Sequence, residues 1–298
     1  MKTTVIRERR TGREQTERVP AGFWLAVVYH PLIRPWLGWI LFGRAWCSRW
    51  LGRLARTSWS RRRIARFIRK YDVDVGECAG QVDEFASFND FFIRRLRPEC
   101  RPCDWQENVL VCPADCRAVF LPALEESESL RIKGFDFRLP ALLAASPDQA
   151  SRLAGGPAMI ARLAPVDCHR YYYPAAGRVL SWQAIPGRYD SVHPLAMRRR
   201  DGILAANSRR VSWLDLTGFG AAAMIEVGAF AVADIVQTHE GREFDKLQEK
   251  GYFNLGGSTI VLLLQPGAVD WDRDLLDNSA AGIETKLPFG ERIGERQT

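Results

Sequence analysis

Short apolar runs separated by glycine, proline and aspartate dominate the chain from residue 109 onward. Examples are VLVCPADCRAVFLP at 109–122, AAAMIEVGAFAVADIVQT at 221–238 and STIVLLLQPG at 258–267. Runs of this length, bounded by turn-forming residues, are typical of short strands. The pattern predicts the α+β fold class, with a β-rich core of short, mostly antiparallel strands.

Helices are expected at fewer places. Ser87 is a suitable N-cap for a helix over residues 88–96 that ends before Pro98. A second helix is expected over 138–154. From residue 36 onward the pattern becomes that of a two-faced helix, with Trp46, Trp50 and Leu54 recurring every four residues and arginines on another side.

Charge and tryptophan are concentrated in this first part of the chain. The first 70 residues carry 17 Lys and Arg against 3 Asp and Glu, whereas the whole chain has a net charge of only +7. Six of the ten tryptophans also lie here: Trp24, Trp36, Trp39, Trp46, Trp50 and Trp59. Indoles favour the headgroup layer of a bilayer and arginines attract anionic lipid. We therefore expect a basic membrane anchor on a mildly acidic body.

This region is not expected to cross the membrane, because Pro31, Arg34 and Pro35 interrupt its apolar run. We predict a disordered basic tail over 1–20, an amphipathic helical membrane-associating region over 21–84 and a folded core over 85–298. Two alternatives remain open for the helical region. Its tryptophan face could pack on the body, or the region could bind nucleic acid, although no nucleic-acid motif accompanies the charge.

The seven cysteines give two indications. An odd count without a secretory signal favours a reduced, cytosolic chain. Cys100, Cys103, Cys112 and Cys116 come close to the spacing of a zinc site. Cysteine is also a commonly buried small residue, and we predict no metal.

Polar residues stand out at three places beside the predicted strands. Asp115 follows a strand, His169 lies between charged residues in RLAPVDCHRYYYPAAG, and Ser258 opens a strand after two glycines in LGGST. A structural histidine and a hairpin turn are the simplest explanations of the last two. Walker, GxGxxG and GxSxG motifs are absent from the sequence.

Taken together, these stretches resemble the pyruvoyl-dependent phosphatidylserine decarboxylase family from about residue 85 to the end. The segments that carry the resemblance occur in the family's order and include FNDFFIRRLRPECRP, CPADCRAVF, RLAPVDCHRYYYPAAGRV, KGYFNLGGSTIVLLL and GIETKLPFGERIG. One such motif would be weak evidence. Nine in order, ending in Gly-Gly-Ser-Thr near the C-terminus, are strong evidence.

The resemblance implies that the Gly257–Ser258 bond cleaves itself. The Ser258 hydroxyl would attack the preceding carbonyl, and elimination would leave a pyruvoyl group at the start of a small chain, 258–298, beside a large chain, 1–257. This covalent pyruvoyl group would be the only cofactor. It would form a Schiff base with phosphatidylserine and accept electrons as CO2 leaves, giving phosphatidylethanolamine.

The chain differs from the family at one residue that is expected to accept a proton. The family's Tyr-His-Arg-x-His pattern keeps its first histidine as His169, which the resemblance associates with decarboxylation. The second histidine, which belongs to an Asp–His–Ser relay for self-cleavage, is replaced by Tyr172. A phenol is a far weaker base than an imidazole at neutral pH. Asp115 and Ser258 are expected to remain in the relay, with Tyr172, His169 or His193 as its base.

The sequence therefore predicts a carboxy-lyase attached peripherally to the cytoplasmic face of a membrane, with phosphatidylserine and the anionic lipid surface as partners and no nucleic acid. A homodimer is left open. Two rival hypotheses are an unprocessed, degenerate paralogue that binds lipid without catalysis, and a decarboxylase for another amine.

Overall fold

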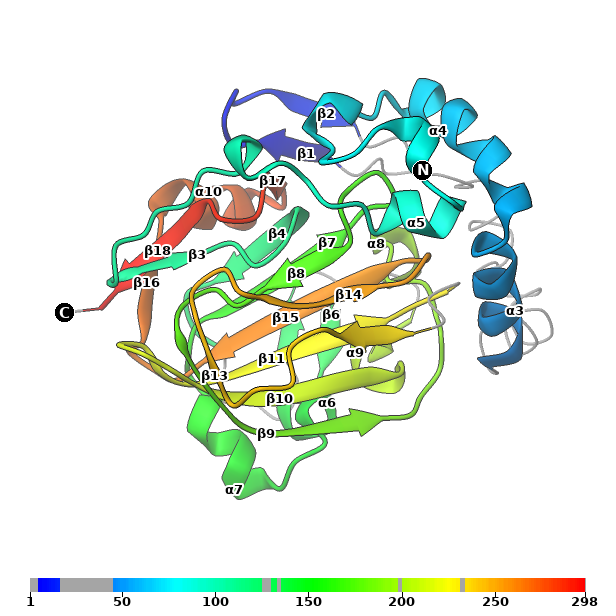
Figure 1. Ribbon diagram of the computed structural model, residues 1–298. Coiled ribbons are helices and arrows are strands. Elements are labelled where there is room, and N and C mark those ends of the chain that lie inside the picture. Colours follow the sequence, from blue (N-terminus) through cyan, green and yellow to red (C-terminus); the bar gives the residue numbers. More distant parts are fainter. Residues whose placement is uncertain are drawn as a thin grey trace.

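A ten-stranded sheet forms the centre of the computed structural model, which describes residues 5–16, 45–124, 130–132, 135–197, 200–230 and 234–297. In spatial order its strands are β13 (Glu243–Phe244), β9 (Gly177–Ile185), β10 (Arg209–Leu216), β11 (Gly220–Gly228), β15 (Ser258–Leu264), β7 (Ala158–Leu163), β4 (Cys116–Leu121), β17 (Glu284–Leu287), β1 (Val5–Glu8) and β2 (Glu14–Thr16). Figure 1 shows this sheet from β9 at the bottom to β2 at the top. Among the described strands of this sheet, β1 and β17 form the one parallel pair.

Three smaller sheets accompany the central one. They consist of β12 (Ile235–Gln237), β14 (Glu249–Phe253) and β8 (Arg170–Tyr172); of β16 (Val269–Trp271), β18 (Arg292–Arg296) and β3 (Val109–Val111); and of β5 (Leu130–Ile132) and β6 (Phe135–Phe137). All their pairings are antiparallel. The prediction of a β-rich, mostly antiparallel core is confirmed.

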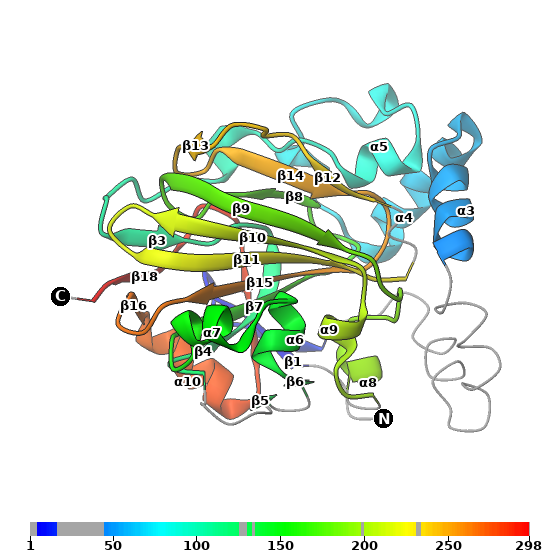
Figure 2. The same ribbon diagram turned by 90° about the horizontal axis from the view of Figure 1, so that it is seen from below.

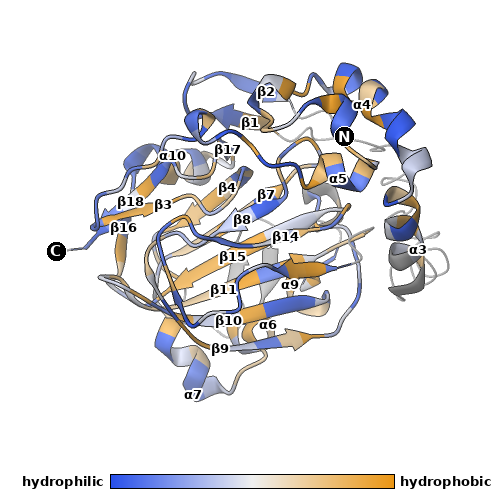
Figure 3. Ribbon diagram, in the orientation of Figure 1, coloured by the Kyte–Doolittle hydropathy of each residue, from blue (hydrophilic) through white to orange (hydrophobic). Residues whose placement is uncertain are grey.

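The middle strands of the central sheet are buried on both faces. On β15, Ile260 and Leu262 belong to one apolar cluster, whereas Val261 and Leu263 belong to another. Figure 2 shows β8, β12 and β14 above the central strands and helices below them. A strand covered on both sides favours apolar residues at successive positions, which explains the IVLLL run of residues 260–264 and the hydrophobic colour of β15 in Figure 3.

The helices are short and lie around the sheets. They are α3 (Ala45–Ala55), α4 (Ile64–Tyr71), α5 (Phe88–Phe92), α6 (Leu139–Leu143), α7 (Pro147–Ala150), α8 (Pro194–Met197), α9 (Ile203–Ala206) and α10 (Arg273–Ala281). Short 3₁₀ turns lie at Ser58–Arg63, Val75–Glu77, Val82–Glu84, Pro98–Cys100 and Ser151–Leu153. Among the described residues, no helix combines the length and apolar character that a membrane span requires.

Two helix predictions need correction. Ser87 does cap α5, accepting a hydrogen bond from the Asp90 amide at 3.1 Å, but the helix ends at Phe92 rather than at residue 96. Leu96 instead forms a β-bridge with Cys78. The expected helix over 138–154 is broken. Ala144 adopts a left-handed conformation with φ of 47°, and Pro147 then begins a new helix.

The predicted disorder of residues 1–20 is wrong for residues 5–16. Strand β1 pairs with β17, and β2 pairs with β1. The guanidinium of Arg9 donates hydrogen bonds to Asp272 and Asp274, each at 2.7 Å. The basic start of the chain is therefore ordered because it pairs with acidic residues of the C-terminal part.

Helical structure is present in the predicted 21–84 region. It includes α3, the 3₁₀ turn Ser58–Arg63 and α4, all on one side of the sheets (Figure 1). Trp50 and Trp59 are each 56% exposed, and Leu54 is also exposed. These side chains do not pack into the body. Trp24, Trp36 and Trp39 lie outside the described residues.

Candidate active site

The first residue of β15 lies against a histidine from the smaller sheet. Ser258 and His169 are both fully buried, and the Ser258 Oγ is 3.0 Å from the His169 Nδ1. Ser258 occupies the end of a central strand, while His169 directly precedes β8. The Phe253 amide of β14 also donates to the His169 carbonyl at 3.0 Å. The fold thus brings together two predicted site residues that are 89 positions apart.

The tautomer of His169 follows from its second contact. Its Nε2 is 3.0 Å from the carbonyl oxygen of Ala164, which can only accept a hydrogen bond. The proton therefore resides on Nε2, and Nδ1 presents a lone pair to the Ser258 hydroxyl. Burial lowers the pKa of the His169 imidazole to about 3, so the ring is neutral at physiological pH. The arrangement is suited to accept a proton from Ser258.

The turn that carries the Ala164 carbonyl is itself fixed. The Asp167 carboxylate accepts from the Ala164 amide at 2.8 Å, and the Asp167 amide donates back to the Ala164 carbonyl at 2.9 Å. Arg117 forms an ion pair with the same carboxylate. Burial raises the pKa of Asp167, and the guanidinium of Arg117 opposes this effect. Asp167 thereby holds the oxygen that orients His169.

The predicted cleavage bond lies in a tight connection before β15. Gly256 has a φ of 147°, which favours glycine. The Gly257 carbonyl accepts a hydrogen bond from the Ala229 amide at 3.1 Å, so a donor already faces the oxygen that would gain charge during attack. A Cβ on Gly257 would meet Ala229 at an ordinary 3.5 Å. The conformational need for glycine is therefore at Gly256, and steric access at Gly257 does not by itself demand one.

Asp115 lies in a different ion pair. Its carboxylate accepts two hydrogen bonds from the Arg101 guanidinium, at 3.0 and 2.7 Å, and a third from the Phe289 amide at 2.9 Å. Arg101 also binds Glu77. Within the described residues, Asp115 makes no hydrogen bond to Ser258 or His169.

The other candidate bases lie elsewhere. Tyr172 stacks on Phe289 with ring centroids 4.4 Å apart, and burial raises the pKa of its hydroxyl. His193 lies in the loop before α8, where its amide donates to the Ser191 hydroxyl. Its neighbour Val192 lies 3.7 Å from the position of a Cβ on Gly257. Of the three, only His169 has a hydrogen bond with Ser258 in the described part of the chain.

Two contributions of α5 were missed by sequence reasoning. Phe92 stacks on the His169 ring at a centroid distance of 3.8 Å. Asn89 donates to the Asn254 side chain at 2.9 Å and accepts from the Leu255 amide at 2.8 Å. The FNDFF segment places polar residues among aromatic ones, and the first of them, Asn89, is buried. That pattern did not reveal which part of the chain the helix contacts.

A buried ion pair between β14 and β11 was also missed. The Lys250 ammonium donates to Glu226 at 2.7 Å, Gln237 at 2.9 Å and Ser212 at 3.0 Å. Lys250 and Glu226 are both almost fully buried. Burial lowers the pKa of Lys250 and raises that of Glu226. Three partners use all the hydrogen-bonding positions of the Lys250 amine, which is typical of a structural group.

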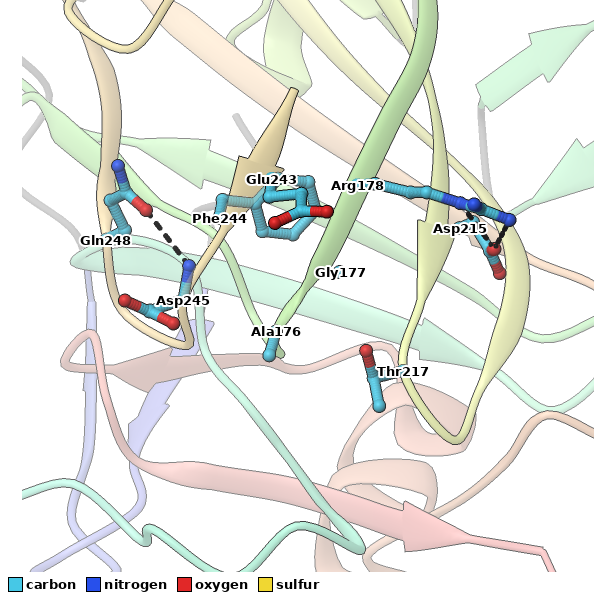
Figure 4. A pocket seen from close by; sticks show the side chains of 9 residues that line it. All are labelled: Ala176, Gly177, Arg178, Asp215, Thr217, Glu243, Phe244, Asp245 and Gln248. Carbon is cyan, nitrogen blue, oxygen red and sulfur yellow. Dashed lines mark hydrogen bonds and ion pairs between the residues drawn. The ribbon is translucent and has the colours of Figure 1, made fainter. Parts of the chain in front are cut away.

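One cavity adjoins the site, and a second lies toward the other end of the central strands. One of 750 Å³ lies behind the Ala164–Asp167 turn, and its charged lining includes Arg94, Asp115 and Asp167. The other, of 570 Å³, lies where β9 meets β13 (Figure 4). Its polar lining includes the Arg178–Asp215 ion pair and Gln248, and none of the predicted site residues contributes to it.

The cysteines occupy separate environments. The sulfurs of Cys112 and Cys116 are 3.6 Å apart and buried, whereas Cys100 and Cys103 are partly exposed. In the part of the chain that the structure describes, no three His, Cys, Asp or Glu residues are grouped closely enough to bind a metal.

The similarity of this chain to known proteins includes the residues of the candidate site. A family model described as phosphatidylserine decarboxylase matches residues 88–295, which include Asn89, His169 and Ser258. The chain belongs to the phosphatidylserine decarboxylase family. Family membership makes it a carboxy-lyase and confirms the resemblance inferred from the motifs.

Curated relatives extend the similarity beyond the family model. A protein named phosphatidylserine decarboxylase proenzyme from Chlamydia felis is 35% identical over 295 residues, which cover 99% of this chain and 98% of the relative. Proteins of the same name from Chlamydia trachomatis and Clostridium perfringens are 36% and 35% identical, covering 97% and 84% of this chain and 96% and 85% of those relatives. The similarity therefore includes the basic N-terminal part.

Proposed function

We propose that this chain is a proenzyme that cleaves itself at Gly257–Ser258 and then decarboxylates phosphatidylserine to phosphatidylethanolamine. The observation that carries the proposal is the 3.0 Å contact between the Ser258 hydroxyl and the unprotonated Nδ1 of His169, beside a glycine carbonyl that accepts from the Ala229 amide. The names of the curated relatives, which include both the substrate and the word proenzyme, support it.

Self-cleavage begins with the buried hydroxyl. His169 accepts the Ser258 proton as the oxygen attacks the Gly257 carbonyl, and the Ala229 amide stabilises the negative charge on that carbonyl oxygen. The C–N bond then breaks, the serine nitrogen takes up the proton, and an ester joins Gly257 to the Ser258 oxygen. The chain has lost no atom at this stage.

Elimination separates the two chains. Loss of the α-proton of Ser258 expels the ester oxygen, so that Gly257 ends in a carboxylate and residue 258 becomes an enamine. Its imine tautomer reacts with one water and releases one ammonia to give the pyruvoyl group. Overall, one water is consumed and one ammonia is released for each cleavage, and no oxidant or reductant is required.

The residues around Ser258 fit a pyruvoyl group. The position is buried, and His169 offers a ring that can exchange a proton with bound substrate. When present, the group supplies an electrophilic ketone that binds the amine of phosphatidylserine and draws electrons from the bond to the departing carboxylate. In the cleaved enzyme we assign His169 to proton transfer. Asp115, together with Arg101, is assigned to holding the neighbouring part of the site in place.

The helical region between residues 45 and 71 is proposed as a membrane-surface attachment, on the cytoplasmic side as the sequence predicts. Trp50 and Trp59 are exposed, and Arg53, Arg56, Arg61, Arg62 and Arg63 are exposed beside them. Partly exposed indoles with surrounding arginines are suited to an anionic lipid surface. Such attachment would bring a lipid substrate to the body of the enzyme.

The proposal is tested with phosphatidylserine in anionic vesicles and two proteins, wild type and Ser258→Ala. Wild type is expected to release CO2 and form phosphatidylethanolamine, because only it can generate the pyruvoyl ketone. Ser258→Ala is expected to remain a single chain without activity. A folded wild type that binds vesicles yet stays whole and inactive would favour the lipid-binding paralogue. Cleavage without activity on phosphatidylserine would favour another amine as substrate.

A further inference from the structure

The connection between β14 and β15 is bound by a side chain from another part of the chain. Only residues 254–257 separate the two strands, and two of these four are glycines, which restrict the backbone least. Asn89 of α5 binds the first half of this connection. Its amide nitrogen donates to the Asn254 Oδ1 at 2.9 Å and its oxygen accepts from the Leu255 amide at 2.8 Å.

The hydrogen bond to Asn254 is buried and the one from the Leu255 amide is partly buried. Asn89 is 5% exposed and Asn254 is 4% exposed, so bulk water competes little for the bond between their side chains. The second half of the connection is fixed on the opposite side, where the Gly257 amide donates to the Phe230 carbonyl and the Gly257 carbonyl accepts from the Ala229 amide. The connection that leads to the scissile bond is therefore held at one end by Asn89 and at the other by the backbone that follows β11.

The same helix also contacts the histidine. Phe92 stacks on the His169 ring, and α5 is anchored through the Ser87 cap and through the Phe88 amide, which donates to the Ser60 hydroxyl at 2.9 Å. Helix α5 thus contacts both His169 and the connection that leads to Ser258. Asn89 binds the backbone segment that precedes the bond to be attacked, and Phe92 contacts the ring of the base.

We propose that Asn89 is a positioning residue for self-cleavage, which sets where the Gly257 carbonyl lies relative to the Ser258 oxygen. This inference rests on the proposed function. Attack by a neighbouring hydroxyl depends on a near-attack geometry, and a misplacement of about 1 Å can cost about 100-fold in rate. Asn89 does not touch the reacting atoms and acts through the backbone of residues 254 and 255.

Three variants separate positioning from general support of the fold. Asn89→Ala removes both hydrogen bonds to the connection. Asn89→Asp keeps an acceptor for the Leu255 amide and loses the donor to Asn254. Ser87→Ala is the matched control, because it removes the cap of the same helix without removing a contact to residues 254–257.

The first measurement is the rate at which fragment 258–298 appears, at a temperature where all variants are folded. We expect Asn89→Ala to be slower than wild type by about tenfold to 100-fold, Asn89→Asp to be intermediate and Ser87→Ala to lie within about twofold of wild type. The pH dependence of the rate should be unchanged in all three, because His169 keeps its environment.

The second measurement does not need cleavage. In a Ser258→Ala background, hydrogen exchange of the segment 254–258 should be faster with Asn89→Ala than with Ser87→Ala, while exchange in β7 and β11 should be the same. Equal cleavage rates and equal exchange in Asn89→Ala and Ser87→Ala would overturn the inference and leave the proposed function intact. A wild type that never cleaves would overturn the proposed function and this role of Asn89 with it.

Discussion

At the residue scale, the central feature is a neutral histidine in contact with a buried serine. The carbonyl of Ala164 fixes the His169 proton on Nε2, so its other nitrogen faces Ser258. Tyr172, which the sequence motifs suggested as a candidate base, instead stacks on Phe289. Of these two residues, His169 is the one that lies within hydrogen-bond distance of Ser258.

This assignment makes a prediction about residues and pH. His169→Asn should abolish appearance of the fragment 258–298, whereas Tyr172→Phe should stay within about threefold of wild type, since its hydroxyl has no hydrogen bond to Ser258. Because burial lowers the pKa of His169 to about 3, the imidazole of the folded protein stays neutral on mild acidification. The cleavage rate should thus be level between pH 8 and about pH 5, where an ordinary histidine would lose most of its basic form.

The stability of the folded protein, unlike the cleavage rate, should fall as the pH is lowered. The unfolded chain binds a proton on His169 below about pH 6.5, but the folded chain does so only near pH 3. The contribution of neutral His169 to stability is therefore complete above pH 6.5 and is lost as the pH falls toward 3.

Fragment time courses across this range, at temperatures where the protein stays folded, check the predicted pH dependence of the cleavage rate. A rate that halves near pH 6.5 would contradict the buried, neutral base.

At the element scale, the helical region and the sheets carry different surfaces. Helix α3 presents Trp50 and Leu54, and the following 3₁₀ turn presents Trp59. A cation–π contact joins the Arg63 guanidinium to the Trp59 ring at 4.9 Å. Exposed tryptophans also occur on the body, at Trp105 and Trp182. The body therefore supplies a control for the surface proposed to bind lipid.

We expect Trp50→Ser with Trp59→Ser to weaken binding to anionic vesicles by at least tenfold, because two indoles are lost from the lipid-facing surface. Trp105→Ser with Trp182→Ser removes indoles that are at least as exposed and should leave binding unchanged. Vesicle flotation in low and high salt measures both. Equal binding by the two double variants would contradict the attachment surface. Point substitutions are preferable to deleting residues 1–60, because β1 belongs to the central sheet.

At the scale of the whole molecule, the two expected chains are interleaved. Strand β15 of the small chain lies between β11 and β7, and β17 lies between β4 and β1, all four of them strands of the large chain. Cleavage at Gly257–Ser258 breaks one connection at the edge of β15 and removes no strand from the sheet. The cleaved protein is therefore expected to remain one folded body.

The sequence predicted the parts of this molecule that depend on local pattern. The alternation of apolar runs and turns identified the antiparallel core, and Ser87 marked the start of α5. It did not predict β1, whose polar residues pair with a strand about 280 positions away. For the same reason the motifs named His169 and Ser258 but did not decide which base contacts the serine, since that contact depends on how β8 packs against β15.

The central claim is that Ser258 becomes a pyruvoyl group by cleavage of the preceding bond. Intact mass measurement of the purified protein under denaturing conditions tests it most directly. The account predicts two masses, one for residues 1–257 ending in a carboxylate and one for residues 258–298 that is lighter than a serine-initiated chain by one ammonia. A single uncleaved mass after prolonged incubation of folded protein would contradict the account, and so would a small chain that begins with an intact serine.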